Sequence, residues 1–279
     1  MYKIVYKQKL NSIVTMMDIY APLVAKKAQA GQFIILRVNS DGERIPLTVA
    51  GFDRDQGTVK IIFQIVGATT KLLDNKAEGE YIEDFVGPLG CATHIEGLKK
   101  VCIVGGGVGC AIALPLAQKL HEQGAEVHSI IGFRNKDLVI LEEEFKLCSN
   151  KLNVMTDDGS HGKKGLVTAQ LEEAINDGEN YDEIFAIGPL IMMKSVVAIT
   201  KPKNIPTSVS MNPIMIDGTG MCGGCRLSVG GKIKFACVDG PDFNGFEVDF
   251  DEAMARASMY RNFEAKAREN CNLFKAEVK

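Results

Sequence analysis

The first third of the chain carries its hydrophobic residues in short runs that are typical of β-strands. These runs are rich in Val, Ile, Phe and Thr, and turn residues such as Asp41-Gly42 separate them. Several short strands at this spacing predict a small antiparallel barrel or sandwich over residues 1–97. The strands are expected at residues 2–6, 13–19, 32–38, 47–52, 58–66 and 81–86, and one short helix is expected at 69–75.

From about residue 98 the pattern changes to short buried strands that alternate with helices. This alternation predicts a parallel α/β sheet, here over residues 98–211. The expected strands are 101–104, 126–131, 151–156, 182–187 and 207–211, and the expected helices are 108–123, 137–148, 166–176 and 192–200.

Residues 212–250 break this rhythm because they are dense in Gly and Cys and offer little material for an apolar core. A short segment of this kind usually needs a metal to hold its fold. A final helix is predicted over residues 251–279, and Ala, Met and Phe lie on one face of its first part, 251–270.

Length and charge narrow the classes of protein that are possible. The 279 residues suit two or three domains, and a formal net charge of −3 does not indicate a nucleic-acid-binding surface. The first 20 residues have no apolar leader segment. The longest uncharged stretch, 101–118, contains four glycines and Pro115, so it predicts a strand, a turn and a helix and not a membrane span. We expect a cytoplasmic protein with neither nucleic acid nor membrane as a partner.

Eight cysteines divide into a scattered set and a cluster. The scattered set is interpreted as small buried hydrophobic residues and comprises Cys91, Cys102, Cys110, Cys148 and Cys271. The other three gather near the C-terminus. In a cytosolic protein, such a cluster of cysteines more often binds a metal than forms disulfides.

The strongest chemical signal is the run from Asp217 through Cys222 and Cys225 to Cys237, with spacings of x4, x2 and x11. Plant-type [2Fe–2S] proteins use C-x4-C-x2-C…C, so Asp217 stands where the first cysteine would be. A carboxylate can bind iron, and as a harder ligand it should alter the cluster potential. Two alternatives stay open: a zinc site with the same donors, and a plain loop carboxylate at Asp217.

A second signal is the glycine run Gly105-Gly106-Gly107-Val108-Gly109, which follows a strand and opens a helix. Glycines allow a pyrophosphate to approach the backbone, and the helix N-terminus favours its negative charge. Tight strand–helix turns also use glycine. The position of the run, after a strand and at the start of a helix, favours nucleotide binding over a plain turn. No carboxylate follows the next strand until Asp137, so the motif does not choose between NAD and NADP.

A third, weaker signal lies in the β region and at two later strand ends. Arg can hold a phosphate or face a flavin ring, and Thr hydroxyls can reach a pyrophosphate. Ligands of open α/β sheets bind beyond the carboxyl ends of strands. The candidate residues are Arg44, Pro46, Leu47, Thr48, Gly67, Thr69, Thr70, Gly87, Pro88, Leu89, Gly90, Asp158, Gly188 and Pro189. The four histidines form no ligand pair and receive no role.

Taken together, the motifs of the barrel, the glycine run and the cysteine cluster resemble the ferredoxin–NADP reductase superfamily, and the resemblance covers almost the whole chain. Within it they are most similar to the electron-transfer subunits of dihydroorotate dehydrogenase and to the small subunits of NADH-dependent ferredoxin:NADP oxidoreductases, relatives of which are also known as sulfide dehydrogenase subunits. The resemblance rests on RIPLT, GPLG, GGGVG, TDDGS, AIGPLIMMK and DGTGMCGGC…FACVDGP. It implies an FAD-binding barrel, a Rossmann-like NAD-binding domain and a C-terminal [2Fe–2S] module.

The resemblance also implies a function and a partner. Arg44, Pro46 and Thr48 would match the flavin motif, Gly67 and Thr70 its phosphate side, and Gly87–Gly90 the loop near the nucleotide. Gly105–Gly109 would hold NAD(H), flanked by Asp158 and Gly188. Electrons would pass between NAD(H), FAD and the cluster without a catalytic side-chain acid or base. The partner in a heterodimer would be a larger flavin and iron–sulfur subunit, similar to the glutamate synthase small subunit, that binds NADPH and reduces ferredoxin by electron bifurcation.

Several positions depart from the family pattern. Orotate-linked relatives usually carry an arginine where Ile45 stands, a serine at Thr48 and a fourth cysteine at Asp217, and a proline is common at Ile112. The departure at Asp217 favours the ferredoxin:NADP subunit. Three alternatives remain: an orotate-linked subunit, a sulfide dehydrogenase subunit, and a zinc-bearing scaffold without redox activity.

Overall fold

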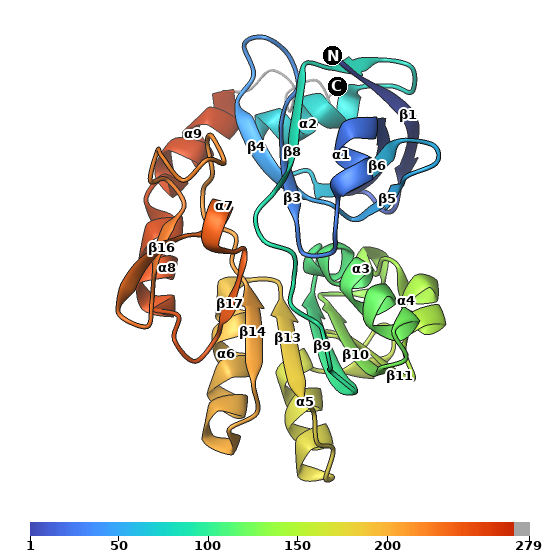
Figure 1. Cartoon of the computed structure of the whole chain (residues 1–279), viewed down its shortest axis with the longest axis vertical. Helices are drawn as coiled ribbons and strands as arrows, with labels where there is room; N and C mark the ends of the chain where they lie inside the picture. Colours follow the sequence, from blue (N-terminus) through green and yellow to red (C-terminus); the bar gives the residue numbers. More distant parts are fainter. Residues whose placement is uncertain (271–279) are drawn as a thin grey trace.

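The computed structural model describes residues 1–270. Residues 271–279 of the predicted C-terminal helix, with Cys271, lie outside the described residues. Figure 1 shows a barrel at the top, a layered α/β domain below it, and a smaller lobe beside both, coloured orange to red. None of the helices in the described part is long and apolar enough to span a membrane.

The N-terminal part is an antiparallel barrel, as the sequence predicts. Its two sheets have the orders β5-β6-β2-β1-β7 and β4-β3-β8. The strands are β1 (Tyr2–Lys9), β2 (Val14–Tyr20), β3 (Phe33–Arg37), β4 (Arg44–Thr48), β5 (Gly51–Asp53), β6 (Thr58–Gln64), β7 (Tyr81–Ile82) and β8 (Asp84–Leu89), and α2 is Ala68–Asn75. Alternating residues such as Met17, Ile19 and Ile61 are fully buried and form the barrel core.

One local expectation in the barrel is wrong, and one element has no counterpart in the sequence prediction. The strand predicted at 47–52 is divided, because β4 ends at Thr48 and the chain turns before β5 begins. A short helix, α1 (Pro22–Lys27), follows β2 and was not predicted. Pro22 stands at its first turn, where a missing N–H costs nothing, and Val24 and Ala25 are buried against the barrel.

The α/β domain has a seven-stranded sheet in the order β12-β11-β10-β9-β13-β14-β17. The strands are β9 (Lys100–Gly106), β10 (Glu126–Phe133), β11 (Lys151–Thr156), β12 (Lys163–Lys164), β13 (Glu183–Ile187), β14 (Thr207–Ser210) and β17 (Asp242–Asn244). The helices are α3 (Gly109–Glu122), α4 (Glu142–Cys148), α5 (Val167–Asn176) and α6 (Leu190–Thr200), with 3₁₀ turns η1 (Lys136–Leu138) and η2 (Lys201–Lys203). All pairs are parallel except β14 with β17. The strand order reverses at β9, and ligands bind at such a switch point.

The helix predicted at 137–148 is shorter than expected. Its first residues form η1, and α4 begins only at Glu142. Leu141, between them, has a φ of 60°, in the left-handed region that a helix cannot continue through. Leu141 and Ile140 are both buried, so packing into the core takes precedence over local helix propensity here.

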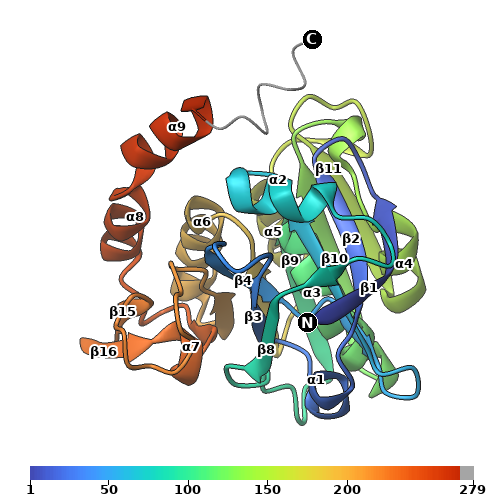
Figure 2. The same cartoon turned by 90° about the horizontal axis from the view of Figure 1, so that it is seen from above.

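The C-terminal lobe contains a hairpin, β15 (Arg226–Val229) and β16 (Lys232–Phe235), and a short helix, α7 (Ala236–Asp239). Strand β17 then leaves the lobe and pairs with β14, so the predicted cluster segment also completes the neighbouring sheet. Two helices follow, α8 (Phe250–Ser258) and α9 (Arg261–Asn270), in place of the single predicted helix. Figure 2 shows them as an arm that curves away from the rest of the molecule.

One buried carboxylate fastens α2 to the barrel. Asp74 Oδ1 accepts a hydrogen bond from Thr15 Oγ1 at 2.6 Å, and Lys9 Nζ lies 2.6 Å from the same oxygen. Burial by itself raises the pKa of Asp74, but the hydrogen bonds from Lys9 and Thr15 and the charges of Lys9 and Lys7 bring it below the ordinary 3.8. A lowered carboxyl pKa stabilises the fold above pH 3.8, and this contribution disappears as the pH falls through the folded-state pKa.

We therefore expect Asp74→Asn to lower the free energy of unfolding at pH 7 by about 1–3 kcal/mol. The difference from wild type should shrink as the pH falls from about 3.8 through the lower folded-state pKa, because the unfolded chain takes up a proton first and the native carboxyl then protonates as well. Urea unfolding between pH 7 and pH 3 measures this. Asp55→Asn, in an exposed turn, is the control and should have little effect. An equal cost at every pH would contradict this role for the Asp74 charge.

Candidate functional site

A cleft of about 860 Å³ lies between the barrel and the α/β domain. Strand β4 and the start of α2 line it on the barrel side, and the loops after β9 and β13 line it on the other side. Ten of the predicted cofactor residues are in this lining: Pro46, Leu47, Thr48, Thr70, Gly106, Gly107, Val108, Gly109, Gly188 and Pro189. The cleft thus brings together the glycine run after β9 and the candidate flavin residues of the barrel, which the sequence analysis identified separately.

The glycine run forms the turn between β9 and α3. Gly107 has a φ of 56°, and its N–H donates to the Gly132 carbonyl at 2.8 Å. No side chain caps the start of α3, and its first turn contains no acidic residue. Its first N–H groups therefore have no side-chain acceptor, which suits an anionic group such as a pyrophosphate.

Gly109 allows two loops to meet at the floor of the cleft. A Cβ at this position would lie 2.4 Å from the Ile187 carbonyl oxygen and 2.8 Å from Gly188 Cα. Both are backbone atoms, so neither could move aside as a flexible side chain would. The close approach of α3 to the loop after β13 therefore requires glycine at 109.

On the barrel side, β4 is an edge strand of its sheet, which tolerates the missing N–H of Pro46. The Thr70 hydroxyl accepts the N–H groups of Val66 and Gly67 and donates to the Gly67 carbonyl. Thr70 therefore holds the turn at the start of α2, beside the cleft. The predicted residue Gly67 is part of this turn and does not itself line the cleft.

Nine predicted residues lie outside the cleft lining: Arg44, Gly67, Thr69, Gly87, Pro88, Leu89, Gly90, Gly105 and Asp158. Arg44 Nη2 lies 3.9 Å from Asp84 Oδ2, and the Thr69 hydroxyl donates to Glu43 at 2.9 Å. The Asp158 carboxylate accepts from both the N–H and the hydroxyl of Ser160, and these hydrogen bonds lower its pKa.

Sequence reasoning missed several residues that do line the cleft. Asp157 lines it in place of Asp158, Arg134 lines it after β10, and Met211–Pro213 line it after β14. Each follows a strand of the parallel sheet, so the rule that ligands bind beyond the carboxyl ends of strands could have found them.

The four predicted metal ligands gather in the C-terminal lobe. The Asp217 carboxylate accepts the Thr219 N–H at 2.9 Å and is within hydrogen-bonding reach of the Cys222 thiol, and both interactions lower its pKa. Cys225 and Cys237 are buried beside each other. The donors thus form two pairs, Asp217 with Cys222 and Cys225 with Cys237.

The chemistry of these donors suits a metal centre. Burial, together with the neighbouring Cys225 thiol, raises the pKa of Cys237. Two thiolates would therefore be costly in this setting unless a cation balanced their charge. Three thiols and one carboxylate in two pairs fit a two-iron cluster, and Gly218, Gly220 and Gly223 provide the positive φ angles of the surrounding loop.

The remaining cysteines within the described residues differ in burial. Cys102, Cys110 and Cys148 are buried as predicted, and burial raises the pKa of Cys102 and of Cys110 to about 12. The prediction is wrong for Cys91, which is exposed. Its thiol donates to the Val238 carbonyl at 3.3 Å, because the loop that carries it runs along the C-terminal lobe.

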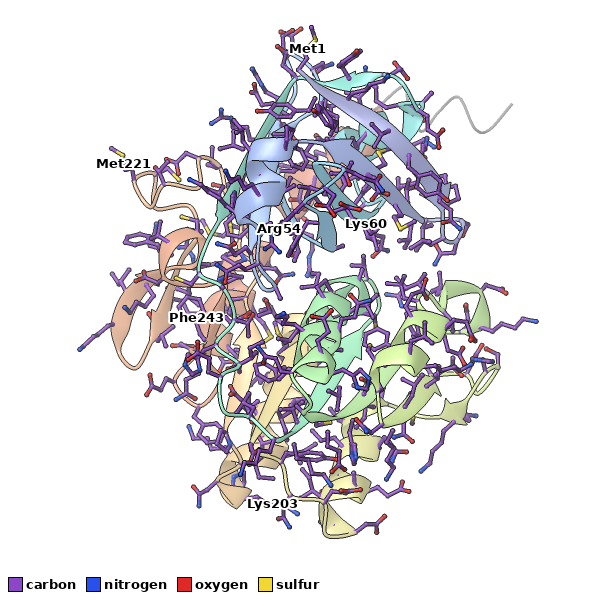
Figure 3. All side chains as sticks on the ribbon, turned by 45° about the vertical axis from the view of Figure 1, so that its right-hand side comes forward. Met1, Arg54, Lys60, Lys203, Met221 and Phe243 are labelled. Carbon is purple, nitrogen blue, oxygen red and sulfur yellow. The ribbon has the colours of Figure 1, made fainter. Side chains whose placement is uncertain are left out.

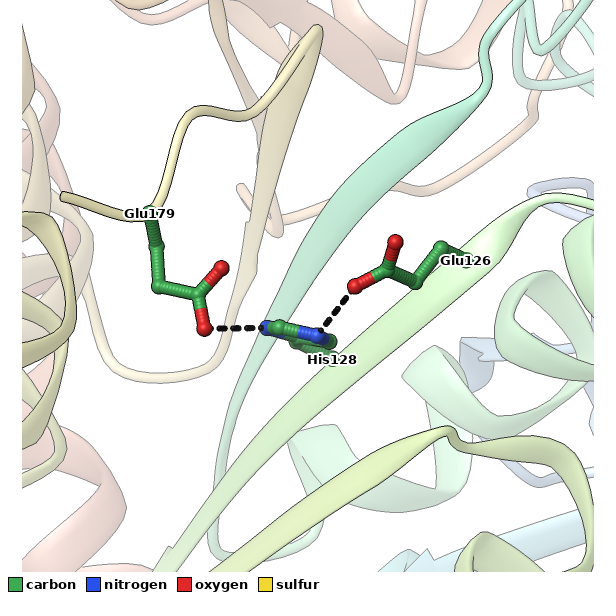
Figure 4. Close-up of side chains that lie close together, drawn as sticks. All are labelled: Glu126, His128 and Glu179. Atoms are coloured by element: carbon green, nitrogen blue, oxygen red, sulfur yellow. Dashed lines mark hydrogen bonds and ion pairs between the residues drawn. The ribbon is translucent and has the colours of Figure 1, made fainter.

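Figure 4 shows a second group of potential ligands: Glu126 and His128 at the amino end of β10, and Glu179 in the loop before β13. Lys100 Nζ lies 2.9 Å from Glu126 and 2.7 Å from Glu179, so an ammonium already bridges the two carboxylates. His128 bonds to Glu126 at 2.8 Å and to the Tyr181 hydroxyl at 3.0 Å. The group is a network of ion pairs that ties β9 and β10 to the loop before β13.

Comparison with known proteins places the chain in a family. Residues 212–249 match the iron–sulfur cluster binding domain of dihydroorotate dehydrogenase B. A Thermotoga maritima protein, a homologue of the electron-transfer subunit of dihydroorotate dehydrogenase B (NAD(+)), is 46% identical over 262 residues, which are 94% of this chain and 92% of that protein. This chain belongs to the electron-transfer subunit family of dihydroorotate dehydrogenase B. The predicted resemblance is therefore confirmed.

Two further relatives match this chain over nearly its whole length. An uncharacterized protein of the adh 3′ region in Clostridium beijerinckii is 51% identical over 276 residues, or 96% of this chain and 93% of that protein. A solved structure of an NADH-dependent reduced ferredoxin-NADP oxidoreductase, studied for flavin-based electron bifurcation, superposes with a TM-score of 0.92 and 42% identity, covering 100% of this chain and 98% of that one. The predicted ferredoxin reductase-like fold with a C-terminal iron–sulfur module is confirmed, and the chain is an electron-transfer subunit of an oxidoreductase.

The Gly109 contact predicts a loss of dinucleotide binding when it is broken. We expect Gly109→Ala to push the loop after β13 away from α3 and to weaken NADH binding roughly tenfold or more. Calorimetric titration with NADH measures this. Glu122→Ala is the control, because this exposed residue lies in the last turn of α3, at the end of the same helix that faces away from the cleft. It should leave NADH affinity unchanged, and equal losses in both variants would argue against a specific role for Gly109.

Proposed function

We propose that this chain passes electrons between NAD(H), FAD and a [2Fe–2S] cluster, as the small subunit of a bifurcating NADH-dependent ferredoxin:NADP oxidoreductase in the cytoplasm. The observation that carries the proposal is that one segment of chain lines both the cleft and a groove beside the proposed cluster site. Met211–Pro213 line the cleft on one side and a groove beside Cys222 on the other. A flavin in the cleft and a cluster at Cys222 would thus be separated by one short segment of chain.

When bound, FAD exchanges a hydride with the nicotinamide and the cluster exchanges single electrons, so the pair links two-electron and one-electron chemistry. The residues of the chain bind and orient these groups, and we assign no side-chain acid or base. We propose that Pro46, Leu47, Thr48 and Thr70 contact the flavin in the cleft, and that Arg44, Gly67, Thr69 and Gly87–Gly90 support its site from outside the cleft lining. We assign the dinucleotide to Gly106–Gly109, Gly188 and Pro189 in the lining, with Gly105 and Asp158 beside it along the chain.

We assign the metal to Asp217, Cys222, Cys225 and Cys237. Their pairing supports a two-iron cluster over a single zinc ion, because Asp217 with Cys222 and Cys225 with Cys237 supply two donors to each of two metals. The match of residues 212–249 to an iron–sulfur domain supports the same choice.

The proposed partner is a larger flavin and iron–sulfur subunit that binds NADPH and reduces ferredoxin. The full-length superposition on the oxidoreductase structure supports this partner. The second candidate is an orotate-producing subunit, which the names of the relatives favour. Asp217, in the place of a fourth cysteine, favours the first candidate. A role in sulfide reduction would use the same partner and the same cofactors.

An absorption spectrum of the anaerobically purified protein tests the cofactors directly. We expect the flavin bands together with a broad iron–sulfur shoulder at longer wavelength, and we expect NADH to bleach both. Bleaching of the shoulder shows that electrons reach the cluster through the chain. A colourless protein that contains zinc would contradict the proposal and support a scaffold without redox activity.

Replacement of Asp217 tests its role as a ligand. Asp217→Cys should retain a [2Fe–2S] cluster, because the spacing then matches the all-thiolate pattern, and it should lower the cluster potential and shift the spectrum toward all-thiolate ferredoxins. Spectroelectrochemical titration measures both. Asp41→Cys, on an exposed barrel loop, controls for an added thiol. An unchanged spectrum and potential in Asp217→Cys would exclude ligation by Asp217.

A further inference from the structure

Polar side chains follow one face of the sheet in the α/β domain, beginning at the cleft. On β14, Val209 is buried in the core that contains α6. Because successive side chains of a strand point to opposite faces, Ser208 and Ser210 face away from α6. Ser210 also lines the cleft. This face of β14 therefore connects the cleft with the opposite side of the sheet through hydroxyl groups.

Asp242, on β17, continues the polar face beyond Ser210. The two residues lie directly opposite each other in the antiparallel pair of β14 and β17, and the Ser210 hydroxyl is a hydrogen-bond partner of the carboxyl. The Thr93 hydroxyl, on the linker of residues 90–99 between the barrel and the α/β domain, donates to Asp242 Oδ2 at 2.5 Å. Figure 3 labels Phe243, the next residue on β17, beside this linker. Hydrogen-bonding groups thus extend without a break from the cleft through Ser210 to Asp242.

The Asp242 carboxyl has no cation to neutralise it. Its partners are hydroxyl groups, and no lysine or arginine of residues 1–270 forms an ion pair with it. Glu183, on β13, is a second carboxyl nearby. It accepts from Ser208 at 2.5 Å and interacts electrostatically with Asp242 and with His94 of the linker. Burial raises the pKa of both carboxyls.

This environment is unfavourable for a residue that only holds the linker in place. A charged carboxylate without a partner cation costs stability when it is buried, and an asparagine at position 242 could accept the same hydrogen bond from Thr93 without that cost. A carboxyl with a raised pKa has a different advantage, because it accepts and releases a proton more readily near neutral pH.

The proposed reaction leaves a proton in the cleft. NADH gives up a hydride, which is one proton and two electrons, and a [2Fe–2S] cluster accepts electrons one at a time. Each NADH therefore yields one NAD+, two electrons that leave through the cluster, and one proton that leaves separately. In the reverse direction one proton must enter. The hydride step needs no side-chain acid or base, whereas this proton needs a route.

Ser210 lies close to where the electrons would leave the cleft. It immediately precedes Met211–Pro213, the segment that lines both the cleft and the groove beside Cys222. Asp157 is the one carboxylate among the cleft-lining residues that the structure describes, and it follows β11, on the other side of β9 from β14. Bound cofactors would also exclude water from the cleft. Ser210 is therefore the better placed of the two to receive the proton.

We propose that Asp242 carries this proton between the cleft and the solvent, and that the proton reaches it through the Ser210 hydroxyl. A hydroxyl can accept one proton and donate another, so Ser210 passes the proton on unchanged. Asp242 is partly exposed, so the O–H bond that forms on its carboxyl can break again by proton transfer to water. Thr93 holds the carboxyl in position. The inference rests on the proposed function, because only the coupling of a hydride donor to a one-electron acceptor releases this proton.

Turnover of NADH with ferricyanide, a one-electron acceptor, tests the route in the full chain with its cofactors. We expect Asp242→Asn and Ser210→Ala each to slow turnover at least tenfold, and to leave the rate of flavin bleaching by NADH unchanged. Asp242→Glu keeps a carboxyl and should retain most of the turnover. Ser208→Ala is the matched control, because it removes a hydroxyl from the same face of β14 that donates to Glu183 and not to Asp242. Wild-type turnover in both Asp242→Asn and Ser210→Ala would overturn the proposal and show that the proton leaves directly through the open side of the cleft.

The pH profile separates proton transfer from a purely structural role. Turnover of the wild type should fall as the pH drops through the raised pKa of Asp242, because a protonated carboxyl cannot accept another proton. This fall should be absent in Asp242→Asn. A pH profile identical to that of the wild type would overturn the proposal. So would a parallel loss of bound flavin, flavin bleaching and turnover, which would assign Asp242 a structural role only.

Infrared difference spectroscopy follows the carboxyl without measuring turnover. Addition of NADH to the wild-type protein should change the C=O band of a protonated carboxyl, and this band should shift in D2O and be missing in Asp242→Asn. A wild-type difference spectrum without a carboxyl band would overturn the proposal independently of any variant.

The same samples distinguish a failure of this inference from a failure of the proposed function. If the wild-type protein shows the flavin and cluster spectra and NADH bleaches both, but Asp242→Asn and Ser210→Ala turn over as the wild type does, only the proton route is wrong. If the wild-type protein lacks those spectra, the proposed function itself fails.

Discussion

The arrangement of the three parts depends on close contact along residues 87–93, which run between the barrel and the C-terminal lobe. A Cβ at Gly90 would lie 2.8 Å from the Gly240 carbonyl oxygen, so the two backbones approach as only glycine permits. A Cβ at Gly218, beside the proposed ligand Asp217, would lie 2.7 Å from Leu89 Cδ1. The cluster loop therefore rests directly on the barrel strand that ends at the predicted GPLG motif.

The GPLG motif, residues 87–90, therefore packs the barrel against the C-terminal lobe and does not line the cleft. Just beyond it, the Thr93 N–H donates to the Ala30 carbonyl in the barrel, and its hydroxyl donates to Asp242 on β17 at 2.5 Å. Burial raises the pKa of Asp242, against the effect of the hydrogen bonds from Thr93 and Ser210. One short segment thus joins the barrel, the sheet and the cluster lobe, and fixes the position of any cluster relative to the cleft.

The cluster lobe is small and gains stability from its neighbours. Its buried residues, including Cys225 and Cys237, belong to the same hydrophobic core as β9 and β13 of the α/β domain. Strand β17 extends that domain's sheet. A lobe of this size has little core of its own, so the shared core and the contact with the barrel hold its fold, and a bound cluster would stabilise it further.

The sequence by itself determined the fold class of each part and the presence of a C-terminal iron–sulfur module. Periodicity separated strands from helices, and the spacing of Asp217, Cys222, Cys225 and Cys237 indicated a cluster, because both signals are local along the chain. Local patterns could not show that Leu141 interrupts a helix, that β17 joins the neighbouring sheet, or that Met211–Pro213 line both the cleft and the groove. Those features depend on packing between residues far apart in sequence, so only the tertiary structure decided them.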